Sequence, residues 1–223
     1  MCGRFDRHRP VADFIEVVDG LILYGSEPAP PSYNIAPSQQ ALVVCGSESG
    51  PVVRALHWGL VPAWVKTPKM ARPINARAET IAQKPMFRDA FKVSRCLVLC
   101  DGYYEWQLRP DDSKQPYRLA LEGGTPFVMA GLWARNTRFT AEPLNTFCIV
   151  TTQASSRCKD IHPRMPVILD REHHQQWLDG SSNTIAAMLR PYEKELSVTP
   201  VSRIVNSPAN NGPQCIAPLQ GQS

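Results

Sequence analysis

Short apolar or alternating runs dominate the middle of the chain, and this pattern predicts β-strands. Most of the runs are rich in Val, Leu, Cys and aromatic residues, and turn-forming residues bound them. The strands predicted from them are Ala41–Cys45, Val52–Trp58, Arg95–Leu99 continuing toward Trp106, Tyr117–Leu121, Phe127–Ala134, Thr146–Thr152 and Pro166–Leu169.

Helical spacing of apolar positions occurs only in short segments. The predicted helices cover Val11–Val18, Met86–Val93, Arg171–Leu178 and Thr184–Leu189. Because the strands follow one another without long helices between them, the order of elements favours an α+β fold. We expect a single domain around a curved, mainly antiparallel, barrel-like β-sheet with peripheral helices.

Proline is frequent, with 21 residues in a chain of 223, and it divides the chain into short elements. The Pro-rich stretch Glu27–Ser32 is interpreted as a loop rather than a linker, since strand-like sequence resumes soon after it. The stretch after Asn206 is polar and is expected to be irregular or frayed. The predicted organisation is one domain over residues 1–205 and a polar C-terminal tail over residues 206–223.

Composition places the chain among ordinary globular proteins, with 43% hydrophobic and 20% charged residues. No apolar run approaches the ~18 residues of a transmembrane helix, and charged residues from Arg4 onward interrupt any signal peptide. The seven cysteines form no C-x-x-C pair, so free thiols in a reducing compartment are expected. We therefore expect a cytoplasmic protein without membrane association, metal site or cofactor.

The net charge is only +4, but basic residues are concentrated between Trp64 and Arg95. Within that segment, eight basic residues stand against Glu79 and Asp89, which gives a local charge of +6. A basic stretch flanked by tryptophan is typical of a nucleic-acid surface. A solvated basic face is equally consistent with the charges alone.

Cys2 is the most informative single residue. A small second residue lets the initiator Met1 be removed, and Cys2 then presents an α-amine and a thiol on adjacent carbons. Their ordinary pKa values are about 8 and about 8.5, so both are partly nucleophilic at neutral pH. The amine can form a Schiff base with an aldehyde, and the thiol can close a thiazolidine ring. Taken on its position alone, Cys2 is more readily explained as a small buried residue.

Three further positions could carry chemistry, and each also has a structural interpretation. Asn75, close to Arg77 and Glu79, could belong to a surface turn. Glu105 lies between two aromatic residues, where it is either the outward position of a strand or a desolvated carboxyl suited to proton transfer. His162 could be a structural histidine.

Several short motifs occur together in a fixed order. They are Met1-Cys2-Gly3-Arg4-Phe5, Tyr33-Asn34-Ile35-Ala36-Pro37, Trp58-Gly59-Leu60-Val61-Pro62, Ile74-Asn75-Ala76-Arg77-Ala78-Glu79-Thr80, Asp101-Gly102-Tyr103-Tyr104-Glu105-Trp106, Ile161-His162-Pro163-Arg164-Met165-Pro166 and Pro200-Val201-Ser202. In these motifs and their spacing, the chain resembles the SOS-response-associated peptidase family of abasic-site-processing proteins.

The resemblance implies a covalent trap for abasic sites in single-stranded DNA. Cys2 matches the family nucleophile, which captures the aldehyde of the ring-opened sugar as a thiazolidine. Asn75 matches the asparagine that contacts the lesion. Glu105 matches the acidic residue beside the nucleophile, and His162 matches an acid–base histidine.

The resemblance also implies a DNA-binding surface. Arg4, Arg77 and Arg164 match positions suited to gripping phosphates. Trp58 and Trp64 are either core residues or faces on which bases flanking the lesion stack.

Two other classes of function stay open at this point. One is an N-terminal-nucleophile peptidase or amidohydrolase that uses Cys2 with His162. The other is a non-catalytic reader of modified DNA or RNA. The family name additionally implies self-processing at Met1, and the chemistry allows a lyase-type activity. A monomer that associates with the nucleoid when it is bound to DNA is expected in the favoured case.

Overall fold

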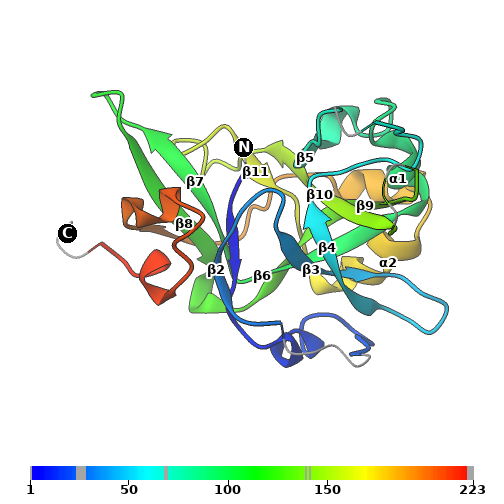
Figure 1. The fold of residues 1–223 in the computed structure, drawn as a ribbon. Helices are drawn as coiled ribbons and strands as arrows, with labels where there is room; N and C mark the ends of the chain where they lie inside the picture. The colour runs from blue at the N-terminus through cyan, green and yellow to red at the C-terminus, as the bar shows by residue number, and fades with distance from the viewer. Residues whose placement is uncertain (1, 24–28, 68–69, 139, 141, 220–223) are drawn as a thin grey trace.

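A computed structural model of the protein describes residues 2–23, 29–67, 70–138, 140 and 142–219 (Figure 1). Its strands are β1 (Phe5–Arg7), β2 (Ser32–Ile35), β3 (Gln40–Cys45), β4 (Val52–Trp58), β5 (Asn75–Arg77), β6 (Arg95–Cys100), β7 (Gly102–Leu108), β8 (Lys114–Leu121), β9 (Phe127–Asn136), β10 (Leu144–Gln153), β11 (Arg164–Pro166), β12 (Ile168–Leu169) and β13 (Leu196–Pro200). Its α-helices are α1 (Arg88–Val93), α2 (His174–Asp179) and α3 (Ser182–Ile185).

Five strands close into a barrel in the order β10-β4-β3-β6-β9, with β9 pairing back onto β10. The pairing of β4 with β10 is parallel, and the other pairings around the ring are antiparallel. Strand β5 adds to β10 in parallel, and β11 and β12 pair with β10 and β9. The predicted barrel-like, mainly antiparallel α+β architecture is confirmed.

A second, fully antiparallel sheet runs in the order β13-β8-β7-β1-β2. Figure 1 shows this sheet beside the barrel, with α1 and α2 on the barrel's side. Strand β1 lies between β7 and β2, with Phe5 opposite both Tyr103 and Ile35. Because Cys2 comes three residues before Phe5, this register places it alongside the second half of β7.

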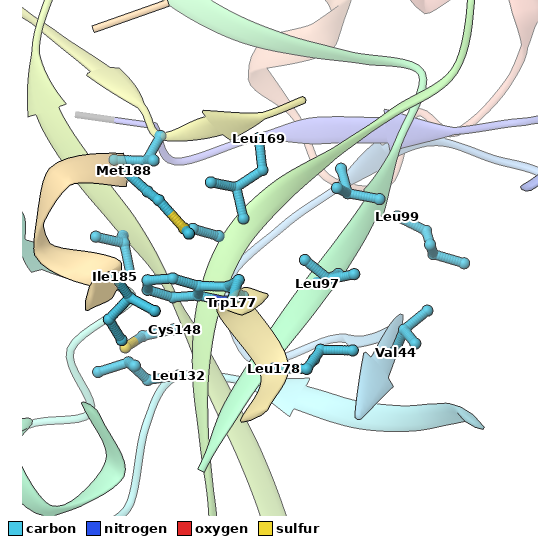
Figure 2. Close-up of a cluster of buried hydrophobic side chains, with 14 of the residues drawn as sticks. Val44, Leu97, Leu99, Leu132, Cys148, Leu169, Trp177, Leu178, Ile185 and Met188 are labelled. Carbon is cyan, nitrogen blue, oxygen red and sulfur yellow. The ribbon is translucent and has the colours of Figure 1, made fainter. Parts of the chain in front are cut away.

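Helix α2 covers part of the barrel with one large side chain, Trp177. Trp177 is fully buried, and its indole nitrogen donates a hydrogen bond of 2.9 Å to the Cys96 carbonyl oxygen. Figure 2 shows Trp177 among Leu97, Leu132 and Met188 in the buried cluster. All seven cysteines are buried and free. Among the described residues, no helix is long and apolar enough to cross a membrane.

Replacing Trp177 with Ala is expected to lower the free energy of unfolding by about 3–5 kcal/mol, because the barrel strands cannot collapse into the space left by an indole. Urea unfolding measures the loss. Trp64→Ala is the control, since Trp64 is 41% exposed and its removal should cost less than about 1 kcal/mol. Equal losses in the two variants would contradict this account of the core.

The predicted elements differ from the structure mainly at their ends. Strand β4 matches the prediction, whereas the run from Arg95 is divided at Asp101 into β6 and β7. The predicted helix Val11–Val18 is a 3-10 helix over Val11–Ile15. Strands β1, β2, β5 and β13 were absent from the prediction. Residues 24–28, which include part of the predicted loop Glu27–Ser32, lie outside the described residues.

The C-terminal segment is not frayed between residues 207 and 219. The Asn211 side-chain oxygen accepts hydrogen bonds from the backbone of Tyr33 (2.7 Å) and Asn34 (3.1 Å), both in β2. Cys215, in the 3-10 helix Pro213–Cys215, is fully buried. This segment therefore packs against the sheet that carries the start of the chain.

Candidate active site

The start of the chain is held where the two sheets meet. Cys2 is 0% exposed, and its carbonyl oxygen accepts a hydrogen bond of 2.8 Å from the Asn75 side chain. Asn75 belongs to β5, which pairs with barrel strand β10, whereas Cys2 leads into β1 of the other sheet. The side-chain oxygen of Asn75 is buried without a hydrogen bond to any described residue. It is therefore an acceptor that a ligand could use.

A buried network fixes the far end of β1. The Arg118 guanidinium donates two hydrogen bonds to the Asp6 carboxylate, at 2.9 and 3.0 Å. Asp101 accepts hydrogen bonds from the backbone of His8 and Arg9, at 2.7 and 3.0 Å. Gly102 leaves the space for Arg118, because a Cβ there would lie 2.7 Å from the guanidinium. Asp6, His8 and Asp101 have the donor types of a metal site, but these ion pairs and hydrogen bonds already engage their oxygens.

Glu105 lies two residues after Tyr103 on β7 and is almost wholly buried. Burial raises the pKa of Glu105 to about 7. A carboxyl with that pKa changes protonation state near neutral pH, which suits proton transfer. The structure thus favours the second of the two interpretations that the sequence left open, a desolvated carboxyl.

The Cys2 thiol is harder to ionise than a free cysteine. Burial raises the pKa of this thiol well above its usual range, and the Glu105 charge raises it further. The expectation from ordinary values, a partly ionised thiol at neutral pH, does not hold in this environment. The sulfur therefore needs a neighbouring base before it can act as a nucleophile.

His162 precedes β11 and approaches Glu105, with 3.9 Å between its Nδ1 and a Glu105 carboxylate oxygen. Its Nδ1 also accepts a hydrogen bond of 3.0 Å from the Arg164 backbone. Burial lowers the pKa of His162, so the ring is neutral at neutral pH. The structure thus brings Glu105 and His162 together, and the Glu105 charge acts on Cys2.

A cleft of about 490 Å³ opens at Glu105 and His162, and Cys2 and Asn75 lie behind its lining rather than in it. It is lined by Gly3, Arg4, Glu105, Trp106, Lys114, His162 and Asn206. Sequence reasoning missed Trp106, Lys114 and Asn206 as site residues. The adjacency of Trp106 to Glu105 was a usable signal, but Lys114 and Asn206 come from distant segments that only the fold brings to the cleft.

Arg4 forms part of the cleft wall through contacts within the protein. Its guanidinium donates hydrogen bonds to the Asn34 side chain (2.8 Å) and to the carbonyl oxygens of Val205 (2.7 Å) and Asn206 (3.3 Å). It also lies over the Trp106 ring, 6.0 Å from its centroid. These contacts use donors that the expected phosphate grip would need, so a DNA-binding role for Arg4 stays a prediction.

The other two predicted arginines differ in how many contacts they make within the protein. Arg164 makes a two-pronged ion pair with Glu79, at 2.5 and 3.0 Å, and donates to the Thr151 carbonyl oxygen at 2.7 Å. This pairing lowers the pKa of Glu79. Arg77, at the end of β5 and two residues after Asn75, is exposed. Arg77 is therefore the more accessible cation of the two for a phosphate.

The two predicted tryptophans differ in how far they are buried. Trp58 is 1% exposed, stacks on Phe147, meets Phe5 edge-on, and donates to the Ile74 carbonyl oxygen. It is a core residue here. Trp64 is 41% exposed and lines a largely apolar groove of about 330 Å³, so its face remains available to a base.

Comparison with known proteins gives a consistent result. The abasic site processing protein YoaM of Bacillus subtilis is 37% identical, over 97% of each chain. The Escherichia coli protein YedK, which carries the same description, is 31% identical over 98% of this chain and 100% of its own. A crystal structure of a Bacteroides thetaiotaomicron protein superposes with a TM-score of 0.83, at 26% identity over 98% of this chain and 100% of that one.

The vertebrate relative HMCES of Xenopus tropicalis, also described as an abasic site processing protein, is 32% identical over 85% of this chain and 66% of its own length. The family model of the SOS response associated peptidases (SRAP) matches residues 1–208, which include Cys2, Asn75, Glu105 and His162. The chain belongs to the SOS response associated peptidase family.

Proposed function

We propose that this protein captures ring-opened abasic sites in single-stranded DNA as a covalent thiazolidine on Cys2, after removal of Met1. The observation that carries the proposal is the placement of Cys2 where Asn75 holds its backbone and a carboxyl with a pKa of about 7 acts on its thiol, beside a cleft open to a ligand. The description of its relatives as abasic site processing proteins agrees with this substrate.

The first bond forms from nitrogen. The neutral α-amine of Cys2 attacks the sugar aldehyde carbon C1′, and the resulting carbinolamine loses water to give an iminium ion. Glu105 is placed to accept the proton that the nitrogen releases and to pass it to the aldehyde oxygen, which takes a second proton from solvent and leaves as water. The neutral His162 ring lies next to this carboxyl. The buried oxygen of Asn75 is an acceptor for a sugar hydroxyl.

The second bond forms from sulfur. The Cys2 sulfur bonds to C1′, the π electrons of the iminium return to nitrogen, and the sulfur's proton passes to the Glu105 carboxylate. Because ring closure removes the iminium, it also removes the driving force for β-elimination and strand cleavage. We therefore propose shielding of the lesion as the main outcome, with lyase activity only from the open iminium.

The DNA strand is proposed to pass from the cleft over exposed cations and aromatics. Arg77 and Lys114 are exposed, and Trp64 offers a free face for stacking. Arg164 and Arg4 would contact phosphates only by sharing donors that Glu79 and the Val205–Asn206 carbonyls now use. We propose that the protein acts as a monomer, in the compartment that contains the cell's DNA.

A peptidase acting on other chains receives less support. Catalytic cysteines have a lowered thiol pKa and some exposure, whereas the Cys2 thiol is buried and its pKa is raised. Self-processing at Met1 remains part of the proposal, since it needs only one turnover on the chain's own start.

The test is a denaturing gel with single-stranded DNA that contains one abasic site. The protein should give a shifted band that survives heating, and the same strand without the lesion should give none. Cys2→Ala should abolish the band while weak DNA binding persists. An undiminished band from Cys2→Ala would overturn the proposal, and salt-sensitive binding without any adduct would favour a non-catalytic reader instead.

A further inference from the structure

Tyr103 carries a buried hydroxyl that the proposed reaction has not yet used. The residue is 0% exposed, and its hydroxyl has no hydrogen bond of normal geometry to any residue that the structure describes. The Cys158 thiol lies beside it, but a thiol is only a weak acceptor. Buried hydroxyls in native proteins are nearly always hydrogen-bonded, so this exception calls for an explanation.

The position of Tyr103 relates it to the nucleophile. Side chains two residues apart on a strand share a face, so Tyr103 and Glu105 point to the same side of β7. Phe5 pairs with Tyr103 across the sheet, and the chain from Phe5 back to Cys2 runs beside the following residues of β7. Tyr103 and Cys2 belong to one buried cluster, together with Cys158.

The ionisable groups facing this hydroxyl are the Cys158 thiol from the loop after β10, the Cys2 thiol from the chain start and the Glu105 carboxyl from β7. Burial raises the pKa of Tyr103 well above its usual range, and the negative charges of these three groups act in the same direction. The phenol therefore keeps its proton at neutral pH. It is a hydrogen-bond donor in the same buried cluster as the Cys2 sulfur, which must become negative.

We propose that Tyr103 is a positioning residue for Cys2, whose hydroxyl donates a hydrogen bond to the sulfur as the sulfur loses its proton. In the ring-closing step, the proton passes to the Glu105 carboxylate, the sulfur–C1′ bond forms, and Tyr103 retains its own proton. The role of Tyr103 in ring closure rests on the proposed function. The hydrogen bond from Tyr103 to the negatively charged sulfur is independent of that function, because it forms without DNA.

Tyr104 provides a matched control on the same strand. It is also fully buried, but its hydroxyl donates a hydrogen bond of 2.7 Å to the Tyr33 carbonyl oxygen, and it belongs to a different buried cluster. Tyr103→Phe and Tyr104→Phe each remove one oxygen atom and keep the ring. A purely structural role predicts that the second substitution is the more damaging, since only Tyr104 loses a hydrogen bond.

The test measures how fast iodoacetamide alkylates Cys2, between about pH 6 and about pH 9.5, in protein whose Met1 has been removed. Mass spectrometry of the N-terminal peptide separates Cys2 from the other cysteines. Tyr103→Phe should slow the reaction at neutral pH about tenfold, and should move the rate-versus-pH curve up by about one pH unit, which is the equivalent shift. Its melting temperature should not fall.

Tyr104→Phe should leave the Cys2 curve in place and lower the melting temperature. An unchanged curve for Tyr103→Phe, or an equal shift in both variants, would overturn the assignment of Tyr103. Adduct formation on abasic DNA is measured in parallel. If Tyr103→Phe shifts the alkylation curve but wild type forms no adduct, the assignment of Tyr103 stands and the proposed function fails. If wild type and Tyr103→Phe form adduct at the same rate and have the same alkylation curve, the proposed function stands and the assignment of Tyr103 fails.

Discussion

A chain whose Cys2 nitrogen is locked in an amide should form no stable adduct with abasic single-stranded DNA. Inserting Glu directly after Met1 achieves this, because a bulky second residue prevents removal of methionine, while every residue around the cleft is kept. Without a free amine the sulfur can give only a reversible hemithioacetal, so the heat-stable band on a denaturing gel should fall to background. Intact mass confirms that Met1 is retained.

Two further variants test the roles of the Cys2 amine and the Cys2 thiol separately. Inserting Ala after Met1 allows methionine removal and leaves a free amine. That amine belongs to the inserted Ala and no longer lies on the carbon next to the one that carries the thiol. A thiazolidine cannot form, so the stable band should again be lost. Cys2→Ser keeps the amine in place and should give a labile Schiff base that borohydride traps. A heat-stable adduct from the Glu-inserted chain would refute the thiazolidine and point to another nucleophile, first of all Lys114 in the cleft wall.

Local sequence was sufficient for the longer strands and insufficient for the short ones. Val52–Trp58 is mainly apolar and is long enough to identify, and the structure confirms it as β4. Strand β1 has only three residues, Phe5–Arg7, of which two are charged. Its burial comes from Arg118 pairing with Asp6, and no periodicity in the sequence contains that distant partner. The barrel likewise closes through the parallel pairing of β4 with β10, a nonlocal contact.

In the candidate site, the sequence likewise identifies the residue types, whereas their surroundings depend on the fold. The sequence and its family resemblance identified Cys2, Asn75, Glu105 and His162, and the fold places Asn75 against Cys2 and His162 near Glu105. Which tryptophan is buried could not be derived, because Trp58 packs against Phe5 and Phe147, which are distant in the sequence. The engagement of Arg164 by Glu79 depends on two segments 85 residues apart in the chain.

The effect of pH on adduct formation should follow Glu105. Because burial raises the pKa of this carboxyl to about 7, the fraction of carboxylate available to accept protons grows as pH rises from about 6 to about 8. The wild-type rate should rise through this window, and it should level off only when the α-amine of Cys2, with an ordinary pKa of about 8, is also deprotonated. Glu105→Gln cannot accept a proton, so its rate should fall by roughly 10²–10⁴ and lose the inflection near pH 7. Single-turnover kinetics on abasic DNA at several pH values measure both effects.

The same substitution should stabilise the protein, but only above the pH at which an unfolded glutamate ionises. The folded state keeps its proton up to about pH 7, whereas an unfolded glutamate releases its proton near 4.5, so the contribution of Glu105 to stability falls as pH rises between these values. At about 1.36 kcal/mol per pKa unit, the cost at pH 8 is on the order of 3 kcal/mol. Glu105→Gln removes this cost. Urea unfolding should therefore find the variant more stable than wild type at pH 8 and nearly equal at pH 5, and a variant less stable at both would contradict the desolvated carboxyl on which the proton transfers depend.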